Sequence, residues 1–242
     1  MSAALPPVCL LAGGLGTRLG EHVRDTPKPL VEVAGRPFLA WVLDLLARQG
    51  AREVVLCVGY LGERIEAAVG DGSAWGLRAR TIFDGPELRG TAGAVRGALE
   101  HLGERFLVLY GDTYLRADYG AVDRAHHASG LPALMTVLRN EGRWDVSNAQ
   151  YADGRVVAYD KRAPTPEMVW IDYGLGVLTP EALDAAPGEP ELADVYHALA
   201  ACGRLAGYEA SERFFEIGTP AALVEAGRFF DEGGGAAPAA TA

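Results

Sequence analysis

The sequence predicts an α/β domain built on a predominantly parallel, mixed sheet that is flanked by helices. Short runs rich in Val, Leu and Ile alternate along the chain with longer stretches of helical periodicity. The strand-like runs are apolar throughout, which is typical of parallel strands covered on both faces. The chain has 242 residues, of which 49% are apolar, so it can bury one sizeable core and is expected to form one domain.

The first half of the chain predicts alternating strands and helices. The strands are expected at Pro7 to Ala12, Glu53 to Gly59, Arg78 to Asp84 and Phe106 to Asp112. The helices are expected at Phe38 to Gln49, Glu63 to Val69 and Thr91 to Leu102. Ligands of such sheets bind at the carboxyl ends of strands, so the glycine-rich loop after the first strand and "YGDTY" after the fourth should meet at one rim.

The second half, from about residue 131, has a different pattern. Strands are predicted in "PALMTVLRN", "SNAQYADGRVVAYDKR" and "VWIDYGLGVL", with Asp153-Gly154 as a two-residue hairpin turn. Helices are expected at Pro180 to Ala186, Leu192 to Cys202 and Pro220 to Phe230. We expect this half to continue the sheet and to form the second wall of a cleft. The end, residues 233–242, is of low complexity and is predicted to be disordered.

Charge and composition argue against several classes of partner. The formal charge is -10, which disfavours duplex nucleic acid as a partner but leaves room for an anionic substrate at a locally positive site. The sequence shows no run of 18 apolar residues and no basic-then-apolar leader, so a cytoplasmic protein without a membrane partner is expected. Cys9, Cys57 and Cys202 are odd in number and predict reduced core thiols.

The segment "LAGGLGTRLGEHVRDTPKPL", residues 11–30, combines glycines with cations. Glycines let backbone N–H groups approach an anion closely. The segment is not a Walker loop, because no Gly-Lys-Ser/Thr follows. It also misses the dinucleotide fingerprint G-x-G-x-x-G, because after Gly14 and Gly16 the third glycine, Gly20, comes one residue late. The glycines alone fit a plain turn equally well.

The residues beside the glycines favour phosphate binding. The guanidinium of Arg18 can contact two phosphate oxygens at once. Lys28 lies between Pro27 and Pro29, which restrict the backbone and keep the segment out of a helix. A cation held in advance loses less entropy when a phosphate binds. A solvated surface lysine is the alternative for Lys28.

These motifs closely resemble the signature of the sugar-1-phosphate nucleotidyltransferases, (L)-A-G-G-x-G-T-R-L followed by P-K-P. The resemblance continues through "GTAGAV", "YGDTY", "YDKR" and "FFEIGTP", up to about Phe230. It implies a Rossmann-like fold of the nucleotide-diphospho-sugar transferase type in one domain, residues 1–232. The nucleotide-binding half would cover about 1–130 and the sugar-binding half about 131–232.

The reaction implied by the resemblance joins a nucleoside triphosphate (NTP) to a sugar 1-phosphate with Mg²⁺ and releases pyrophosphate. Arg18 would hold the β- and γ-phosphates, Lys28 the α-phosphate or both reacting phosphates, and Asp112 the metal. Asp112 can also be explained as the cap of a turn. The residues implied in nucleotide binding are Leu11, Ala12, Gly13, Gly14, Gly16, Thr17, Gly90, Thr91 and Gly111. Gly90 and Thr91 fit the start of a helix as well.

The sugar half departs from the family pattern in two places. Glu216 stands where the family usually has Asp, and the resemblance implies it as a second metal ligand, bound directly or through a water. Asp160 stands where the family usually has Glu, next to Lys161, which the resemblance places on the sugar's phosphate. Asp172 is also implied to face the sugar. A solvated hairpin is the alternative for Asp160 and Lys161.

Among the family's branches, the motifs most resemble the heptose-1-phosphate guanylyltransferases, which makes GTP a weak preference. N-acetylmuramate-1-phosphate uridylyltransferases come close behind. A phosphocholine-type cytidylyltransferase and a non-catalytic nucleotide-sugar sensor stay open as alternatives, and so does a homo-oligomer. His126, His127 and the four tryptophans have no spacing that indicates a site.

Overall fold

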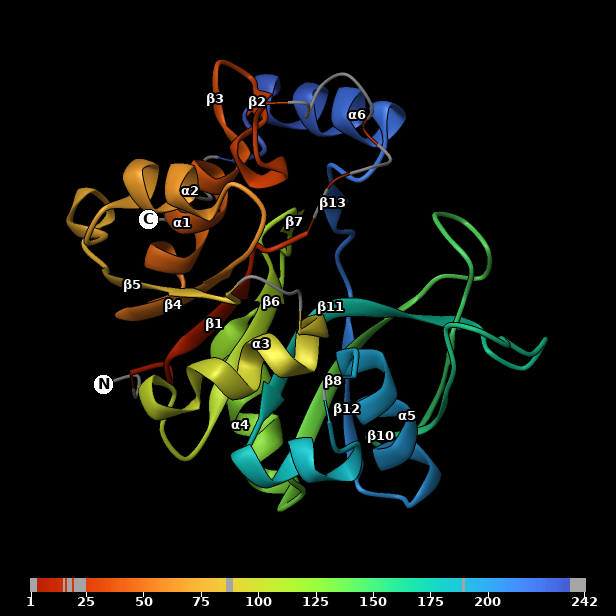
Figure 1. The fold of residues 1–242 in the computed structure, drawn as a ribbon. Helices are drawn as coiled ribbons and strands as arrows, with labels where there is room; N and C mark the ends of the chain where they lie inside the picture. The colour runs from red at the N-terminus through yellow and green to blue at the C-terminus, as the bar shows by residue number, and fades with distance from the viewer. Residues whose placement is uncertain are drawn as a thin grey trace, which may run out of the picture.

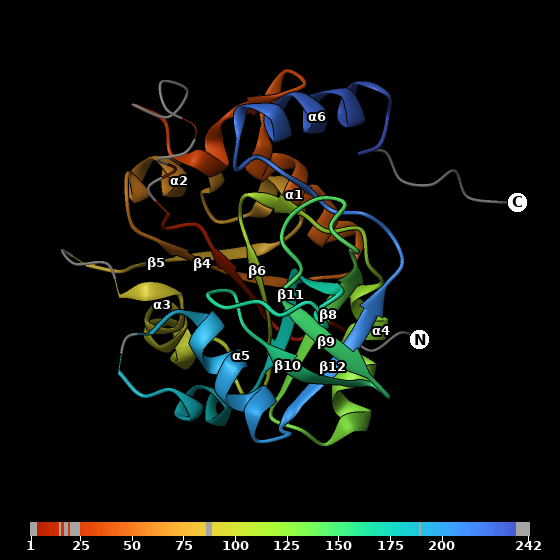
Figure 2. The same ribbon diagram turned by 90° about the vertical axis from the view of Figure 1, so that its right-hand side faces the viewer.

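A computed structural model describes residues 4–14, 16, 19, 25–85, 89–188 and 190–235 of the chain. The described residues form a nine-stranded sheet in the order β5-β4-β1-β6-β11-β8-β12-β10-β9. Figures 1 and 2 show that the helices pack on both sides of this sheet. The expected mixed sheet flanked by helices is confirmed. No helix in the described part of the chain is long and apolar enough to cross a bilayer.

The first half of the chain builds the parallel part of the sheet. Its strands are β1 (Val8–Leu11), β4 (Glu53–Val58), β5 (Arg78–Phe83) and β6 (Phe106–Tyr110). The connecting helices are α1 (Phe38–Arg48), α2 (Gly62–Val69) and α3 (Gly90–Ala98). The chain leaves β1 toward β4 on one side and returns to β6 on the other. A crevice between the carboxyl ends of β1 and β6 is therefore the expected ligand site.

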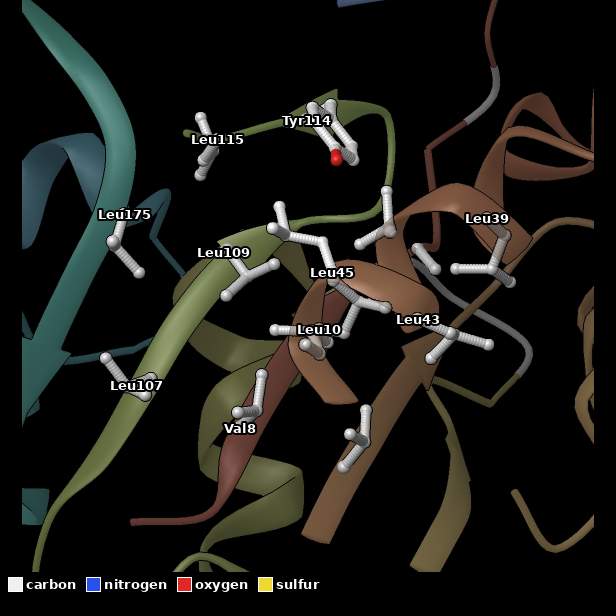
Figure 3. Packing of buried hydrophobic residues seen from close by; sticks show 14 of the residues in the cluster. Val8, Leu10, Leu39, Leu43, Leu45, Leu107, Leu109, Tyr114, Leu115 and Leu175 are labelled. Carbon is white, nitrogen blue, oxygen red and sulfur yellow. The ribbon is translucent and has the colours of Figure 1, made fainter. Parts of the chain in front are cut away.

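Each strand of the parallel part contributes side chains to both faces of the sheet. Val8, Leu10, Leu107 and Leu109 pack with α1, whose buried residues recur at helical spacing. Figure 3 shows this cluster, with Leu39, Leu43 and Leu45 of α1 turned toward the strands. The residues between them in β1 and β6 face α3 and α5 (Leu192–Ala201). This two-sided burial explains why the strands read as continuous apolar runs.

The second half is mainly antiparallel. β11 (Trp170–Leu178) pairs antiparallel with β6 and with β8 (Ala133–Arg139), and β9 (Ala149–Ala152) with β10 (Arg155–Tyr159). Asp153 and Gly154 both have positive φ, at 49° and 74°, so the predicted hairpin turn is confirmed. The polar helix α4 (Tyr119–Ser129) connects the two halves.

Several elements differ from the sequence-based expectation. The prolines do not exclude every helix, because Lys28–Leu30 forms one 3₁₀ turn, and a first turn tolerates proline. The stretch Pro180–Ala185 is also 3₁₀ rather than α-helical. β12 (Leu205–Ala210), parallel to β8, was not predicted. Cys202 is exposed, not in the core, whereas Cys9 and Cys57 are buried with their sulfurs 3.6 Å apart.

Two short sheets and the last helix complete the described chain. β2 (Glu32–Val33) pairs with β3 (Arg36–Pro37), and β7 (Thr113–Tyr114) with β13 (Phe215–Glu216). α6 (Pro220–Asp231) lies beside β2 and β3 in both ribbon views (Figures 1 and 2). Residues 233–235, assigned to the tail from the sequence, continue from α6, and Gly235 lies against the ring of Trp41. Residues 236–242 lie outside the described part.

Candidate active site

A cavity of about 340 Å³ opens where β1 and β6 end, at the crevice expected from the strand order. Many of the residues proposed from the sequence line it: Leu11, Ala12, Gly13, Gly14, Lys28, Gly90, Thr91 and Asp112. Gly111 lies beside β1, since its backbone N–H donates to the carbonyl of Leu11 at 2.8 Å. The glycine loop and the Asp112 turn therefore meet at one rim, as predicted.

Gly13 lies where a side chain would be crowded by its neighbours. A Cβ atom at this position would come within 3.1 Å of both Oδ2 of Asp84 and the backbone nitrogen of Gly59. Contacts that short require the neighbouring atoms to move. One of these atoms, the nitrogen of Gly59, belongs to the backbone of the loop after β4. The absence of a side chain at Gly13 therefore keeps the wall of the cavity close to β4 and β5.

Lys28 and Asp112 form an ion pair at the mouth of this first cavity. Lys28 is buried, because the 3₁₀ turn holds it against the end of β6. The other carboxylate oxygen of Asp112 accepts from the hydroxyl of Thr113 at 3.1 Å. A buried ammonium costs desolvation energy unless it is paired, so each group stabilises the other's position. This arrangement excludes the alternative of a solvated surface lysine.

Thr91 is tied to the start of α5, 100 residues further along the chain. Its backbone N–H and its hydroxyl donate to the carboxylate of Glu191 at 3.1 and 2.6 Å, and its hydroxyl accepts from the N–H of Leu192 at 2.7 Å. Thr91 therefore joins the beginnings of α3 and α5, and Glu191 lines the first cavity with it. Sequence reasoning missed Glu191, because nothing local connects it to Thr91.

Asp84 is a second acidic residue that the sequence analysis did not assign to the site. It follows β5 directly and lines the first cavity. Burial raises the pKa of its carboxyl, and the positive charge of Arg89 opposes that shift. The rule that led to Asp112, a carboxylate at the carboxyl end of a strand, also applies to Asp84 and could have found it.

A second cavity, of about 690 Å³, opens next to the first and is lined by the antiparallel half. Lys161 and Asp172 face each other in it, with Nζ of Lys161 at 3.1 Å from Oδ2 of Asp172. The charge of Asp172 raises the pKa of Lys161, although burial acts in the opposite direction. The ammonium is therefore fully charged at neutral pH.

Asp172 is held by more groups than Lys161 alone. The hydroxyl of Tyr159 donates to its Oδ2 at 3.0 Å, and the N–H of Gly174 donates to its Oδ1 at 2.9 Å. Its own N–H donates to the side-chain oxygen of Asn148 at 2.9 Å. Asp172 is thus a fixed anion in the wall of the cavity, and it positions the lysine in front of it.

Asp160 is placed apart from the other sugar-side residues. Its Oδ1 accepts from the backbone N–H groups of Arg162 and Ala163 at 2.7 and 2.9 Å, and it lines neither cavity. These two backbone hydrogen bonds lower the pKa of its carboxyl. The structure therefore agrees with the alternative of a hairpin residue for Asp160, but not for its neighbour Lys161.

The backbone of Glu216 runs beside that of Asp112 on an adjoining strand, but Glu216 lines the second cavity rather than the first. It pairs with Thr113 across β7 and β13, and the next residue, Ile217, donates to the carbonyl of Asp112 at 3.1 Å. Its carboxylate accepts from the N–H of Gly218 at 3.0 Å. The described residues contain no group of three acidic, His or Cys side chains arranged for a metal.

Two further residues of the second cavity were not assigned from the sequence. The ring of Trp144, set aside as a scattered aromatic, lines the cavity and lies 5.6 Å from the guanidinium of Arg213. Arg213 also makes two hydrogen bonds to Glu225 at 2.5 and 2.6 Å. These residues come from separate loops and α6, so their proximity depends on the fold. Thr17 and Arg18, by contrast, lie outside the described residues.

The chain is similar in sequence to known nucleotidyltransferases. The sequence profile of the family described as "MobA-like NTP transferase domain" matches residues 8–221. An N-acetylmuramate alpha-1-phosphate uridylyltransferase of Neisseria meningitidis is 33% identical over 228 residues, which cover 90% of this chain and 95% of that protein. A D-glycero-alpha-D-manno-heptose 1-phosphate guanylyltransferase of Campylobacter jejuni is 36% identical over 109 residues, 45% of this chain and 48% of that protein.

Solved structures show the same fold. A putative glucose-1-phosphate thymidylyltransferase from Bacillus anthracis superposes with a TM-score of 0.82, covering 93% of this chain and 95% of that one, at 19% identity. The expected resemblance is thus confirmed by a profile over most of the chain and by a relative over nearly its full length. The chain belongs to the family of MobA-like NTP transferase domains, among sugar-1-phosphate nucleotidyltransferases.

Proposed function

We propose that the protein transfers a nucleotidyl group from an NTP to a sugar 1-phosphate and releases pyrophosphate. The observation that carries this proposal is the pair of adjoining cavities, each with a lysine held by an aspartate. The first cavity would take the nucleotide beside the glycine loop. The second would take the sugar, whose phosphate would lie between Lys161 and Lys28.

The reaction needs positive charge more than it needs an acid or a base. An oxygen of the sugar phosphate attacks the α-phosphorus, a P–O bond forms, and the bond to the pyrophosphate oxygen breaks. Two polyanions meet while negative charge builds on the phosphate oxygens. Lys28 lines the first cavity and pairs with Asp112, two residues after Tyr110, which lines both cavities, so its ammonium would contact the reacting phosphates. Arg18 would contact the pyrophosphate that leaves.

Asp112 is the residue that fits a divalent metal. Its carboxylate lines the first cavity at the end of a strand, and Mg²⁺ prefers one or two carboxylates together with the phosphates of its substrate. Bound there, Mg²⁺ would neutralise charge on the triphosphate. Lys28 would then turn its ammonium from Asp112 to a phosphate oxygen. Glu216, from the adjoining strand, would support this site through water.

For the substrates, we place UTP with N-acetylmuramate 1-phosphate first. The uridylyltransferase relative aligns over 95% of its length, whereas the heptose guanylyltransferase aligns over 48% of its own. GTP with a heptose 1-phosphate is the second pair to test, since identity over the shorter alignment is higher, at 36%.

The test is pyrophosphate release with each of four NTPs against a panel of sugar 1-phosphates and phosphocholine, with and without Mg²⁺. We expect release with at least one NTP and sugar 1-phosphate, and only when the metal is added. A folded protein that binds NTP without releasing pyrophosphate from any pair would support a sensor instead. Turnover on phosphocholine alone would support a cytidylyltransferase of that type.

A further inference from the structure

Tyr110 lies on the boundary between the two cavities. Among the described residues, it is the one that lines both of them. It ends β6, opposite Leu11 of β1, and stands two residues before Asp112. A ligand whose sugar occupies the second cavity and whose phosphate reaches the first therefore has to pass Tyr110.

The ring of Tyr110 is held in place by the neighbouring strand. β11 has an irregularity between Asp172 and Gly176, and Gly174 within it has a φ of 87°. A Cβ atom on Gly174 would lie 3.7 Å from Cδ2 of Tyr110, so the ring lies directly over this glycine. The positive φ disfavours any residue with a side chain at this position. At this irregularity β11 thus packs a residue without a side chain against the ring of Tyr110.

The hydroxyl of Tyr110 lies among charged groups but has no hydrogen-bond partner of its own among the described residues. Lys161, Asp172, Asp112 and Glu191 are the charged groups that act on it. A tyrosine phenol is ordinarily neutral at neutral pH, so this O–H can donate a hydrogen bond to a ligand.

We propose that the hydroxyl of Tyr110 donates a hydrogen bond to a phosphate oxygen of the sugar 1-phosphate and so holds this phosphate between Lys161 and Lys28. The inference rests on the proposed function and adds a substrate-binding residue to it. A neutral donor suits the position, because a third cation beside two existing Lys–Asp pairs would compete with them for the carboxylates. A phenol can contact the phosphate without breaking either pair.

The test compares Tyr110→Phe with the wild-type protein and with Tyr196→Phe. The Tyr110 variant keeps the ring over Gly174 and removes only the oxygen. Tyr196 is a matched control, because it is buried on the same side of the sheet and lines neither cavity. We expect the KM for the sugar 1-phosphate to rise about tenfold in Tyr110→Phe, as for the loss of a hydrogen bond to a charged group. The KM for the NTP should stay within about twofold in both variants, a range too small for such a loss.

Three results would overturn the inference. They are an unchanged KM for the sugar 1-phosphate in Tyr110→Phe, an equal rise in both KM values, and the same rise in Tyr196→Phe. If the wild-type protein turns over no pair, the proposed function fails on its own. Calorimetric titration of the proteins with N-acetylmuramate 1-phosphate then decides the role of Tyr110. Weaker binding by Tyr110→Phe alone supports it, and equal affinities, or no binding by any of the proteins, refute it.

Discussion

The two halves of the molecule each present a lysine paired with an aspartate, but with opposite exposure. In the parallel half the lysine is enclosed and the carboxylate is open: the side chains of Lys28 and Asp112 are 10% and 29% exposed. In the antiparallel half the carboxylate is enclosed and the ammonium is open, since Asp172 is 5% and Lys161 43% exposed. The first pair therefore exposes its carboxylate, and the second pair exposes its ammonium.

This difference follows from the elements that carry each pair. Lys28 is packed by the 3₁₀ turn against the ends of β1 and β6, while Asp112 stands in the turn after the strand. Asp172 lies within β11 and is fixed by Tyr159, Asn148 and Gly174, while Lys161 lies in the loop after β10. An open carboxylate suits a metal bound to triphosphate, and an open ammonium suits the phosphate of a sugar.

Lys28→Ala should have the largest effect. We expect kcat to fall by about a hundredfold or more, or on the order of 3 kcal/mol of transition-state stabilisation, because the ammonium offsets charge on the reacting phosphates. Steady-state kinetics with saturating substrates would measure it, with circular dichroism to show that the variant is folded. Near-normal turnover would mean that the reacting phosphates lie elsewhere.

Asp112→Asn should separate the metal role from the stability role of the first pair. The Mg²⁺ concentration needed for half-maximal activity should rise sharply, because a carboxylate ligand is lost. Stability should fall by about 2 kcal/mol, less than the roughly 3–5 kcal/mol for a fully buried pair, since Asp112 is partly exposed.

A metal titration and chemical denaturation would give these two values for Asp112→Asn. An unchanged metal titration would contradict the ligand assignment. Asp172→Asn provides the comparison, because it should leave the Mg²⁺ requirement as in the wild type.

Lys161→Met should affect the sugar side alone. Methionine keeps most of the length and the apolar stem but loses the ammonium, so the KM for the sugar 1-phosphate should rise about tenfold. The KM for the NTP should be nearly unchanged, because Lys161 lines the second cavity and not the first. A similar rise for both substrates would show that the two cavities do not divide the ligands as we propose.

The smallest effect concerns pH. Asp172 raises the pKa of Lys161 in the folded protein. The charged ammonium therefore contributes its full stabilisation below the ordinary lysine pKa of about 10.4. That contribution is lost only as the pH rises through the higher pKa of the folded state. In Asp172→Asn this pKa should fall, and the KM for the sugar 1-phosphate should begin to rise at lower pH than in the wild type. Measuring the KM for the sugar 1-phosphate between about pH 7 and 10, close to the ordinary lysine pKa, would show the shift. Identical pH profiles would mean that Asp172 does not set the charge of Lys161.

Sequence reasoning succeeded where the chemistry is local. The strands β1, β4, β5 and β6 were predicted because each is a continuous apolar run bounded by turn residues. Asp112 and Lys28, which line the first cavity together, were singled out because each stands in a recognisable motif. β12 was missed because "LAGYEA" has weak alternation and gains its strand partners only from β8 and β10.

The missed site residues have a common cause. Glu191 approaches Thr91 from 100 residues away, and Tyr110 acquires its place only because β11 bulges at Gly174. Asp160 and Lys161 are neighbours in the chain, yet one caps a turn and the other enters the cavity. Adjacent side chains leave a backbone in different directions, and that direction is set by the fold.

The sequence by itself determined the alternation of strands and helices, the glycine-rich loop after the first strand and the identity of the paired charges. These depend on periodicity, on backbone restriction by glycine and proline, and on residue chemistry, all of which act over a few positions. Only the tertiary structure decided which partner of each Lys–Asp pair is open to a ligand, and that Tyr110 stands between the two cavities. Burial is a property of the packed chain, because it depends on strands that come together from distant parts of the sequence.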